Sequence, residues 1–491
     1  MSRSMPDWLA MRAARRPDEP AIRTRSVRWS RAQLLEAADA LATALVAEGV
    51  GPGDRIASVL ADDAPAVVLI HAVRRLGAVL VPLSRRAAAV ELSGQLKTAR
   101  AGILVHDGAD AELAVEAAGA RVERHRIEVL MAGAPCAAPP ALRTEVDLDA
   151  PAAIIFTSGT TGRPKGAVLT HGNLAASAHA WANVLGPRAT DRWLACLPLF
   201  HVAGLAIVTR AARWGVELQV ADRFDVVEVA AALEDGISHV SLVPAQLEQL
   251  LAARDGRPAP STLRAILLGG GPIPATLLTH ARDAGYRVLT TYGMTETASG
   301  IAVGGADAVT LADPTAGCVL PPTEIRIALA DSPDGSGEIL VRGPTVFAGY
   351  VDDATATAEV LRDGWLNTGD IGTVDSVGLL RVADRRDDLI ISGGENVYPA
   401  EVEAALVAHP DVVEAAVVGR PDARWGAVPV AAVAMEATAT ATDDELAHYC
   451  REHLAGFKVP LRFHRLDGLP RNGLGKVRRR DLRDALEGEA W

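Results

Sequence analysis

The stretch from Ile154 to Val168, IIFTSGTTGRPKGAV, constrains the fold of this chain more than any other. The apolar run from Ala152 to Phe156 predicts a buried strand, and a loop of Thr, Ser, Gly, Pro and Lys follows it at once. Such a loop exposes backbone N–H groups, hydroxyls and one cation, which are the groups that polyphosphate oxygens bind. A flexible surface hairpin is the alternative. The combination favours a phosphate-binding loop at the end of a strand.

The glycines and the lysine of this loop have separate uses. Gly159, Gly162 and Gly166 allow close approach of the backbone to a ligand, and Lys165 supplies a point charge. The loop is not a Walker A motif, because no Ser or Thr follows the lysine and the glycine spacing differs. The sequence therefore indicates a nucleotide site outside the P-loop class.

Alternating strands and helices around the loop predict an α/β fold with a mostly parallel sheet. Residues 56–60 and 77–83 are predicted strands that flank a helix over 66–76, and Ser30 is a candidate N-cap of an amphipathic helix. Residues 100–150 have a weak pattern, which we interpret as a short strand, a helix and a surface connection. The alternation implies a large domain built of several α/β layers.

Length and charge limit the classes of protein that fit. The chain has 491 residues, which is too long for one core, and its net charge of −12 argues against nucleic acid as a partner. The four cysteines form no metal spacing, so we expect reduced thiols in a cytoplasmic protein. No signal peptide and no apolar run long enough to cross a bilayer is expected. The oligomeric state, a homo-oligomer included, stays open.

Residues 157–166, TSGTTGRPKG, resemble the phosphate loop of the adenylate-forming superfamily, which contains acyl-CoA synthetases, luciferases and peptide-synthetase adenylation domains. The resemblance extends over essentially the whole chain. It implies that ATP binds and that a carboxylate is activated as an acyl-adenylate. From this loop the resemblance implies a set of ATP-binding residues: Thr157, Ser158, Gly159, Thr160, Thr161, Gly162 and Lys165.

Two further stretches resemble nucleotide motifs of the same superfamily. LRAILLGGGPIP (263–274) predicts a strand followed by glycines, and VLTTYGMTET (288–297) predicts a strand that ends in a polar loop. In the superfamily, Thr295 would contact the α-phosphate and Glu296 would hold Mg²⁺ through oxygen. A surface carboxylate is the alternative for Glu296. The other nucleotide residues implied here are Gly270, Gly271, Pro272, Thr291, Tyr292, Gly293 and Met294.

The resemblance also implies a domain division. Asp370, in TGD, would accept hydrogen bonds from both ribose hydroxyls, and Arg385 would contact ribose and phosphates. The superfamily's hinge is usually G-R-x-D-D, but Asp384 replaces its glycine here, and Asp387 would be the pivot. We expect an adenylation domain over 1–384, a hinge over 385–388 and a small mobile α/β domain over 389–491.

The small domain would carry the catalytic lysine. PRNGLGKVRRR (470–480) resembles the superfamily's lysine loop and would project Lys476, although a basic surface turn is the alternative. Gly393 and Gly394 would line the tunnel that admits the pantetheine of CoA. Between the two half-reactions, rotation about the hinge would remove the lysine from the active site and open this tunnel.

Three residues are candidates for the acid pocket. His201 follows a Pro-bounded turn, Arg210 lies nine residues later in an apolar helix, and Ser241 ends a strand. For His201 the alternative is a satisfied structural side chain, and for Arg210 it is a solvated helix residue. A guanidinium in the pocket would suit a second carboxylate on the substrate.

Four stretches, PDWLAMRA, LPLFHVAGL, HVSLVPAQLEQLL and LLGGGPIP, are similar to the o-succinylbenzoate–CoA ligases of menaquinone biosynthesis. The resemblance implies an acid–thiol ligase that uses ATP, Mg²⁺ and CoA. The alternatives are another aryl- or medium-chain acyl-CoA ligase and an inactive nucleotide-binding homologue. A domain that loads a carrier protein is less expected, because no carrier segment is recognised after the lysine loop.

Overall fold

The structure is a computed structural model, and it divides the chain into two compact units. Unit 1 comprises Met1–Ile325 and Val341–Leu366, and unit 2 comprises Arg326–Leu340 and Asn367–Trp491. The structure describes residues 4–87, 89–133, 141–157, 165–271, 273–305, 315–329, 335–385, 390–392, 395–397, 399–422, 425–454, 456–471 and 477–487.

The first large sheet of unit 1 carries the strand before the phosphate loop. Its order is β20-β10-β9-β5-β4-β6-β7, and β9, β5, β4, β6 and β7 run parallel, whereas β10 is antiparallel to both neighbours. The strands are β4 (Arg55–Val59), β5 (Val79–Pro82), β6 (Ile103–His106), β7 (Glu123–Arg126), β9 (Pro151–Thr157), β10 (Lys165–Thr170) and β20 (Gly349–Tyr350). Its helices include α3 (Ala64–Leu76), α4 (Ala89–Ala99), α5 (Ala111–Ala118) and α6 (Ile127–Met131).

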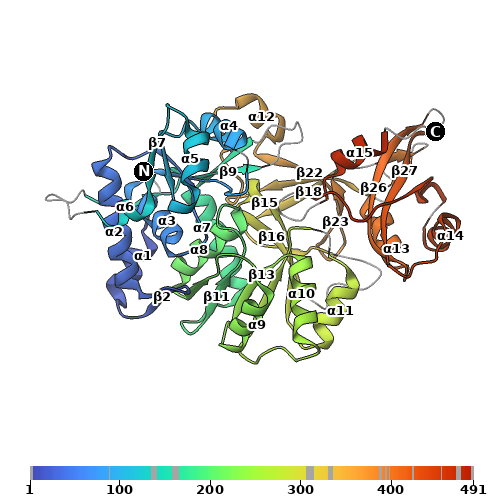
Figure 1. Cartoon of the computed structure of the whole chain (residues 1–491), viewed down its shortest axis with the longest axis horizontal. Coiled ribbons are helices and arrows are strands. Elements are labelled where there is room, and N and C mark those ends of the chain that lie inside the picture. The colour runs from blue at the N-terminus through green and yellow to red at the C-terminus, as the bar shows by residue number, and fades with distance from the viewer. Residues whose placement is uncertain are drawn as a thin grey trace. The chain divides into compact units, whose positions relative to one another are not determined.

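The second large sheet of unit 1 contains the strands that precede the other predicted motifs (Figure 1). In unit 1 the order is β17-β16-β15-β14-β13-β11-β12-β2-β3, and the run from β15 to β2 is parallel. The strands are β2 (Pro20–Arg23), β3 (Arg28–Ser30), β11 (Arg192–Ala195), β12 (Glu217–Val220), β13 (His239–Leu242), β14 (Ala265–Leu268), β15 (Val288–Met294), β16 (Ser299–Gly305) and β17 (Gly317–Val319). Helices α9 (Val226–Glu234), α10 (Pro244–Arg254) and α11 (Ala275–Asp283) belong to this part, and they share one apolar core with β11, β13, β14 and β15.

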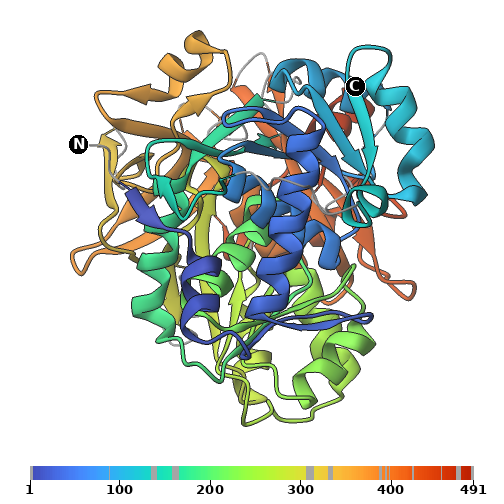
Figure 2. The same cartoon turned by 90° about the vertical axis from the view of Figure 1, so that its left-hand side faces the viewer.

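Local signals explain where the other helices of unit 1 begin and end. Ser30 and Gln33 form a capping box on α2 (Arg31–Ala47), and Thr170 and Asn173 form one on α7 (His171–Leu185). Helix α8 (Val202–Trp214) ends at Gly215, whose φ of 72° is readily adopted only by glycine. Helix α1 (Trp8–Arg15) and α2 lie on the side of unit 1 that faces the viewer in Figure 2. Shorter elements are β1 (Ser4–Pro6), β8 (Glu145–Asp147), α12 (Ala354–Val360) and β21 (Leu361–Arg362).

Unit 2 contains a smaller α/β part. Most residues of β18 (Glu324–Leu329), β19 (Gly337–Arg342) and β22 (Trp365–Val374), and all of β23 (Leu379–Arg385), belong to it, and these strands follow one another in one sheet. A second sheet has the order β25-β24-β27-β26, and β28 pairs with β27. Its elements are β24 (Ile390–Ser392), β25 (Glu395–Val397), α13 (Pro399–Val407), β26 (Val412–Asp422), β27 (Gly426–Met435), α14 (Asp443–His453), β28 (Phe463–Arg465) and α15 (Arg479–Glu487).

The predicted α/β class, with a large N-terminal and a small C-terminal domain, is confirmed. The helix that Ser30 begins and the strands before each motif lie where the pattern placed them. Residues 100–150 hold more structure than expected, since β7, α6 and β8 accompany the predicted strand and helix. The boundary at 385–388 stays a prediction.

In the described part of the chain Cys196, Cys318 and Cys450 are free thiols, while Cys136 lies outside it.

Within the residues that the structure describes, no helix combines the length and apolar character that a membrane span needs.

Candidate active site

The hairpin of β9 and β10 holds both ends of the phosphate loop. Lys165 lies directly opposite Thr157 in the antiparallel register, and the Thr157 hydroxyl lies 3.5 Å from the Lys165 carbonyl oxygen. The predicted buried strand before the loop is confirmed. Five predicted loop residues lie outside the described residues: Ser158, Gly159, Thr160, Thr161 and Gly162. The paired strands therefore fix where the loop leaves and rejoins the sheet.

Two predicted nucleotide residues, Lys165 and Glu296, meet at a tyrosine that the sequence analysis did not single out. The Tyr350 hydroxyl donates a hydrogen bond of 2.8 Å to Glu296 Oε1, and the Lys165 ammonium nitrogen lies 5.2 Å from the centroid of the Tyr350 ring. Glu296 is only 4% exposed, so it is not the surface carboxylate of the alternative interpretation. The sequence offers only an aromatic residue in the segment FAGY (347–350) as a signal for Tyr350.

The carboxyl ends of β13, β14 and β15 bring three predicted stretches to one edge of the sheet. Ser241 lies at the end of β13, Gly270 and Gly271 follow β14, and Thr291 lies near the end of β15. The open carboxyl edge of parallel strands is where α/β proteins bind ligands. A side chain on the preceding residue, Gly269, would place its Cβ 2.3 Å from the Thr291 hydroxyl. Tyr292 and Met294 belong to the same strand, and Pro272 lies outside the described residues.

A tight turn after β15 carries Thr295 and Glu296. The buried Thr297 hydroxyl closes it, since it accepts from the Met294 N–H at 3.0 Å and lies 2.9 Å from the Ser299 carbonyl oxygen. A Cβ on Gly293 would lie 2.1 Å from that carbonyl oxygen, so only glycine fits there. Ser299 has a φ of 89°, which is strained for a residue with a side chain. The strained residue lies two positions beyond the predicted motif stretch 288–297.

The turn before α8 places His201 at the N-cap of that helix. Its ring packs against Phe200, with ring centroids 4.1 Å apart. The Leu199 N–H donates to Asp62 Oδ1 at 3.0 Å, and burial raises the pKa of Asp62 to about 6. Asp62 could not be found from the sequence, because a loop carboxylate distant in the sequence gives no local signal of such a contact.

Arg210 is a buried cation in α8, with 3% of its surface exposed. Its guanidinium carbon lies 5.0 Å from the Trp181 ring centroid and 5.9 Å from that of Trp193. Its Nη2 lies 3.4 Å from the hydroxyls of Ser177 and Ser299, and its Nε is buried without a hydrogen-bond partner in the described part of the chain. Burial lowers the pKa of the guanidinium to about 9. The solvated alternative for Arg210 is therefore wrong.

Arg210 also lacks an acidic partner among the described residues. No carboxylate of the described residues forms an ion pair with it, and the lowering of its pKa has no contribution from a neighbouring acid. A buried charge without a counter-ion is costly. The environment around Arg210 therefore favours an anionic ligand.

Unit 2 carries the predicted ribose residues. Asp370 in β22 is 7% exposed and lies opposite Arg385 of β23 in the antiparallel register. Arg471 and Val477 form a bridge on either side of residues 472–476. The remaining predicted residues lie outside the described residues: Asp387, Gly393, Gly394 and Lys476.

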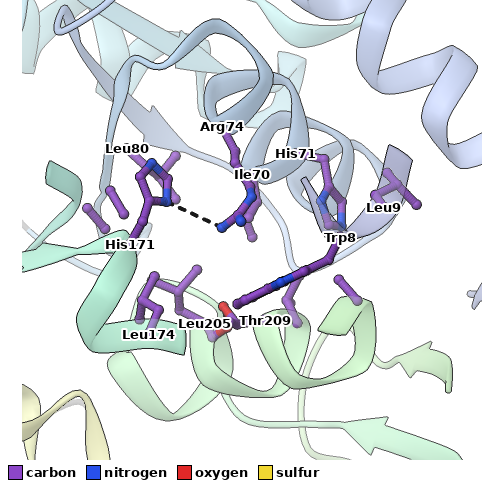
Figure 3. Close-up of a pocket in the computed structure, with 14 residues that line it drawn as sticks. Trp8, Leu9, Ile70, His71, Arg74, Leu80, His171, Leu174, Leu205 and Thr209 are labelled. Carbon is purple, nitrogen blue, oxygen red and sulfur yellow. Dashed lines mark hydrogen bonds between the residues drawn. The ribbon is translucent and has the colours of Figure 1, made fainter. Parts of the chain in front are cut away.

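A separate cavity of about 40 Å³ lies in unit 1, and no predicted site residue lines it (Figure 3). Arg74 donates to Asp7 at 2.9 Å and lies 3.3 Å from His171 Nδ1. Burial lowers the pKa of His71 to about 4 and that of His171 to about 3. The lining is mostly apolar: Trp8, Leu9, Ile70, His71, Arg74, Leu80, Ala152, Ala153, His171, Leu174, Leu205, Val208, Thr209 and Ala212. The cavity has room for a few water molecules, and it is not the nucleotide site.

Comparison with known proteins shows which family the chain resembles. The chain is 39% identical over 492 residues to the 2-succinylbenzoate–CoA ligase of Bacillus cereus, covering 99% of this chain and 100% of the relative. It is 41% identical over 488 residues to the enzyme of that name from Geobacillus kaustophilus, covering 98% of each.

Solved structures of related enzymes also match this chain over almost its full length. The o-succinylbenzoate CoA synthetase of Bacillus subtilis, in complex with the acyl-adenylate intermediate OSB-AMP, matches with a TM-score of 0.92 and 37% identity over 100% of this chain and 99% of that one. The ATP-bound MatB of Rhodopseudomonas palustris matches with a TM-score of 0.90 and 30% identity over 99% of each chain. Residues 9–351 match the AMP-binding enzyme family, and residues 401–476 match the AMP-binding enzyme C-terminal domain. The chain belongs to the AMP-binding enzyme family.

Proposed function

We propose that the protein is an AMP-forming acid–thiol ligase whose acid is o-succinylbenzoate. In the first half-reaction a carboxylate oxygen of the acid attacks the α-phosphorus of ATP, and the bond to pyrophosphate breaks. In the second, the CoA sulfur attacks the acyl carbon, and AMP leaves with the electron pair of the acyl C–O bond. The relatives named 2-succinylbenzoate–CoA ligase, which this chain covers almost completely, support this reaction.

The buried guanidinium of Arg210 is the observation that carries the dicarboxylic part of the proposal. An acid with one carboxylate at the reacting end and a second one elsewhere would neutralise a cation that has no acidic partner among the described residues. Trp181 and Trp193 flank the guanidinium and would offer aromatic faces to the substrate ring. A monocarboxylic acid would leave the charge buried and unpaired. The alternative acids are therefore less favoured.

The nucleotide side of the reaction needs charge neutralisation more than a general base, since the acid, with an ordinary pKa of about 4, is already ionised at neutral pH. Lys165 would face the phosphates, and Lys476 would stabilise the charge that develops on pyrophosphate. His201 and Ser241 would line the acid pocket, and Tyr292 would stack on adenine. Asp370 and Arg385 would hold the ribose.

The residues present fit a magnesium ion that arrives with ATP. Mg²⁺ is usually bound by one or two carboxylates together with substrate phosphates and water. Glu296 offers one buried carboxylate, and the described residues contain no cluster of three or more His, Cys, Asp or Glu side chains for a resident metal. When bound, the ion would screen the triphosphate from the incoming carboxylate.

The division of labour between the domains is also part of the proposal. Residues 389–491 would act as a lid that brings Lys476 to the first half-reaction. The hinge over 385–388, with Asp387 as its pivot, would then exchange the lysine for the tunnel beside Gly393 and Gly394. We further infer a cytoplasmic enzyme whose partners are small molecules, with neither nucleic acid nor membrane insertion involved.

Pyrophosphate release over a panel of acids tests the proposal. The panel contains o-succinylbenzoate, benzoate, 4-phenylbutyrate and succinate, each with ATP and Mg²⁺, before and after addition of CoA. We expect release with o-succinylbenzoate well above the others, and formation of its thioester once CoA is present. Comparable release with a monocarboxylic acid would reject the dicarboxylic substrate. The absence of release with any of the acids would reject the assigned substrate range.

A further inference from the structure

The backbone around Tyr350 is fixed at several points. Strand β20 pairs with β10, and the Ala348 and Val351 N–H groups donate to the carbonyls of Val168 and Gly166 at 2.9 and 2.8 Å. The Tyr350 N–H itself donates to the Thr357 hydroxyl at 2.9 Å. The tyrosine therefore stands on a rigid edge strand, next to the strand that begins with Lys165.

The segment that leads into this strand is held by a helix. The Asn173 side-chain amide, in the first turn of α7, donates to the carbonyls of Pro344 and Val346 at 2.9 and 2.8 Å. The Phe347 N–H donates to the Glu296 carbonyl oxygen at 2.9 Å, and the Phe347 ring meets the Tyr350 ring edge-on at 5.0 Å. The same segment thus holds the backbone of Glu296 and the side chain of Tyr350.

The tyrosine contacts Glu296 and Lys165 through different parts of its side chain. Its hydroxyl donates to Glu296 Oε1, while the face of its ring lies within cation–π distance of the Lys165 ammonium. A hydrogen bond to one oxygen of a carboxylate restricts the orientation of the whole group.

Taken together with the proposed function, on which this step rests, these contacts assign a role to Tyr350. We propose that Tyr350 is a positioning residue for the metal–nucleotide complex: its hydroxyl orients the Glu296 carboxylate toward the magnesium of MgATP, and its ring holds the ammonium of Lys165 beside the phosphates. Groups that hydrogen-bond a metal ligand set the orientation of that ligand and tune its affinity. A purely structural brace would instead support the fold and leave metal dependence unchanged.

Removal of the hydroxyl alone is the first test. In Tyr350→Phe the ring over Lys165 remains, but Glu296 loses its donor. The Mg²⁺ concentration that gives half-maximal pyrophosphate release should rise about 10- to 100-fold. The matched control is Tyr286→Phe, because Tyr286 is a buried tyrosine that also has a cation near its ring, with Arg254 6.0 Å from the ring centroid. The control should keep the Mg²⁺ dependence of the wild type.

A second variant and a binding measurement separate the two contacts. Tyr350→Leu also removes the ring, so the KM for ATP at saturating Mg²⁺ should rise roughly 3- to 10-fold beyond that of Tyr350→Phe. Binding of Mn²⁺·ATP, followed by electron paramagnetic resonance without any acid present, should weaken in the same order.

An unchanged metal dependence and unchanged Mn²⁺·ATP binding in Tyr350→Phe would overturn the inference. A lowered melting temperature with wild-type metal dependence would also overturn it and leave a structural brace. The proposed function is judged separately, by whether the wild type releases pyrophosphate with o-succinylbenzoate.

Discussion

Arg210 shows how far single residues can be interpreted from sequence. Its distance from His201 along one apolar helix, and the resemblance, were enough to predict a pocket cation. They could not show that Trp181 and Trp193 flank it, that Ser299 reaches it from a strained turn, or that it lacks an acidic partner in the described part of the chain. Those facts depend on packing between segments far apart in the sequence. Tyr350 was missed for the same reason.

Replacement of Arg210 by methionine should separate function from stability. The change removes a desolvated charge partner, so kcat/KM for o-succinylbenzoate should fall by roughly 1.5 to 3.5 decades, which corresponds to about 2–5 kcal/mol. The unfolding temperature of the free enzyme should not fall, because an unpaired buried charge is replaced by an apolar side chain. Kinetics and calorimetry on the same preparation check both parts.

Arg213→Met is the control for this prediction, since Arg213 lies in the same helix and also packs on an aromatic ring, that of Trp8. The Arg213→Met enzyme should keep the preference of the wild type for the dicarboxylic acid. If Arg210→Met lowers activity toward dicarboxylic and monocarboxylic acids equally and also lowers the unfolding temperature, the role of Arg210 is structural.

At the scale of elements, prediction succeeded where a pattern was strong and local. The N-cap of α2 and the apolar strands before each motif could be located because their signals lie within a few residues. Residues 100–150 gave a weak pattern, and β7 depends on pairing with β6. Gly349–Tyr350, in the segment FAGY (347–350), pairs with β10. Such edge strands are set by distant partners, which no local pattern shows.

The burial of His71 in α3 should make unit 1 sensitive to acid. Burial lowers the pKa of His71 to about 4, with Arg74 acting in the same direction and Asp7 opposing it. Because the folded-state pKa lies below the ordinary 6.5, the neutral form contributes stability above about pH 6.5, and this contribution is lost as the pH falls toward 4. The free energy of unfolding should drop by on the order of 3 kcal/mol over this window.

Urea unfolding at pH 7, 5.5 and 4.5 measures this loss. His71→Leu should show a shallower pH dependence, whatever its stability at pH 7. His280→Leu, which alters an exposed histidine of α11, should keep the wild-type slope. An unchanged slope in His71→Leu would show that other groups, His171 among them, account for the acid sensitivity.

At the scale of the whole molecule, length and composition shift predicted two domains, and the structure divides into two compact units. The residues at 326–340 belong to the second unit, although they precede its main part by many residues. The sequence could not show this, because that grouping depends on strand pairing across a long insertion. The roles of the hinge and of the catalytic lysine loop stay predictions that depend on the resemblance.

Removal of the predicted catalytic cation, Lys476, should slow adenylation, which is the first half-reaction. Lys476→Ala should lower pyrophosphate release by roughly 10²- to 10³-fold while ATP binding largely survives, because the ammonium would act on charge that develops in the transition state. Lys458→Ala, which removes another lysine of unit 2, should leave release near the wild-type rate. Near-normal release from Lys476→Ala with acid and ATP would contradict the assignment.

Restriction of the hinge should slow thioester formation, which is the second half-reaction. Proline fixes φ near −65°, so Asp387→Pro should hinder the rotation that follows adenylation. Thioester formation should slow by at least about tenfold more than pyrophosphate release does, because adenylation precedes that rotation. Asp387→Ala removes the same carboxylate without fixing φ, and it should slow the second step much less. Single-turnover measurements of each half-reaction decide the matter, since equal losses in both steps, or equal effects of the two substitutions, would mean that residue 387 is not a pivot.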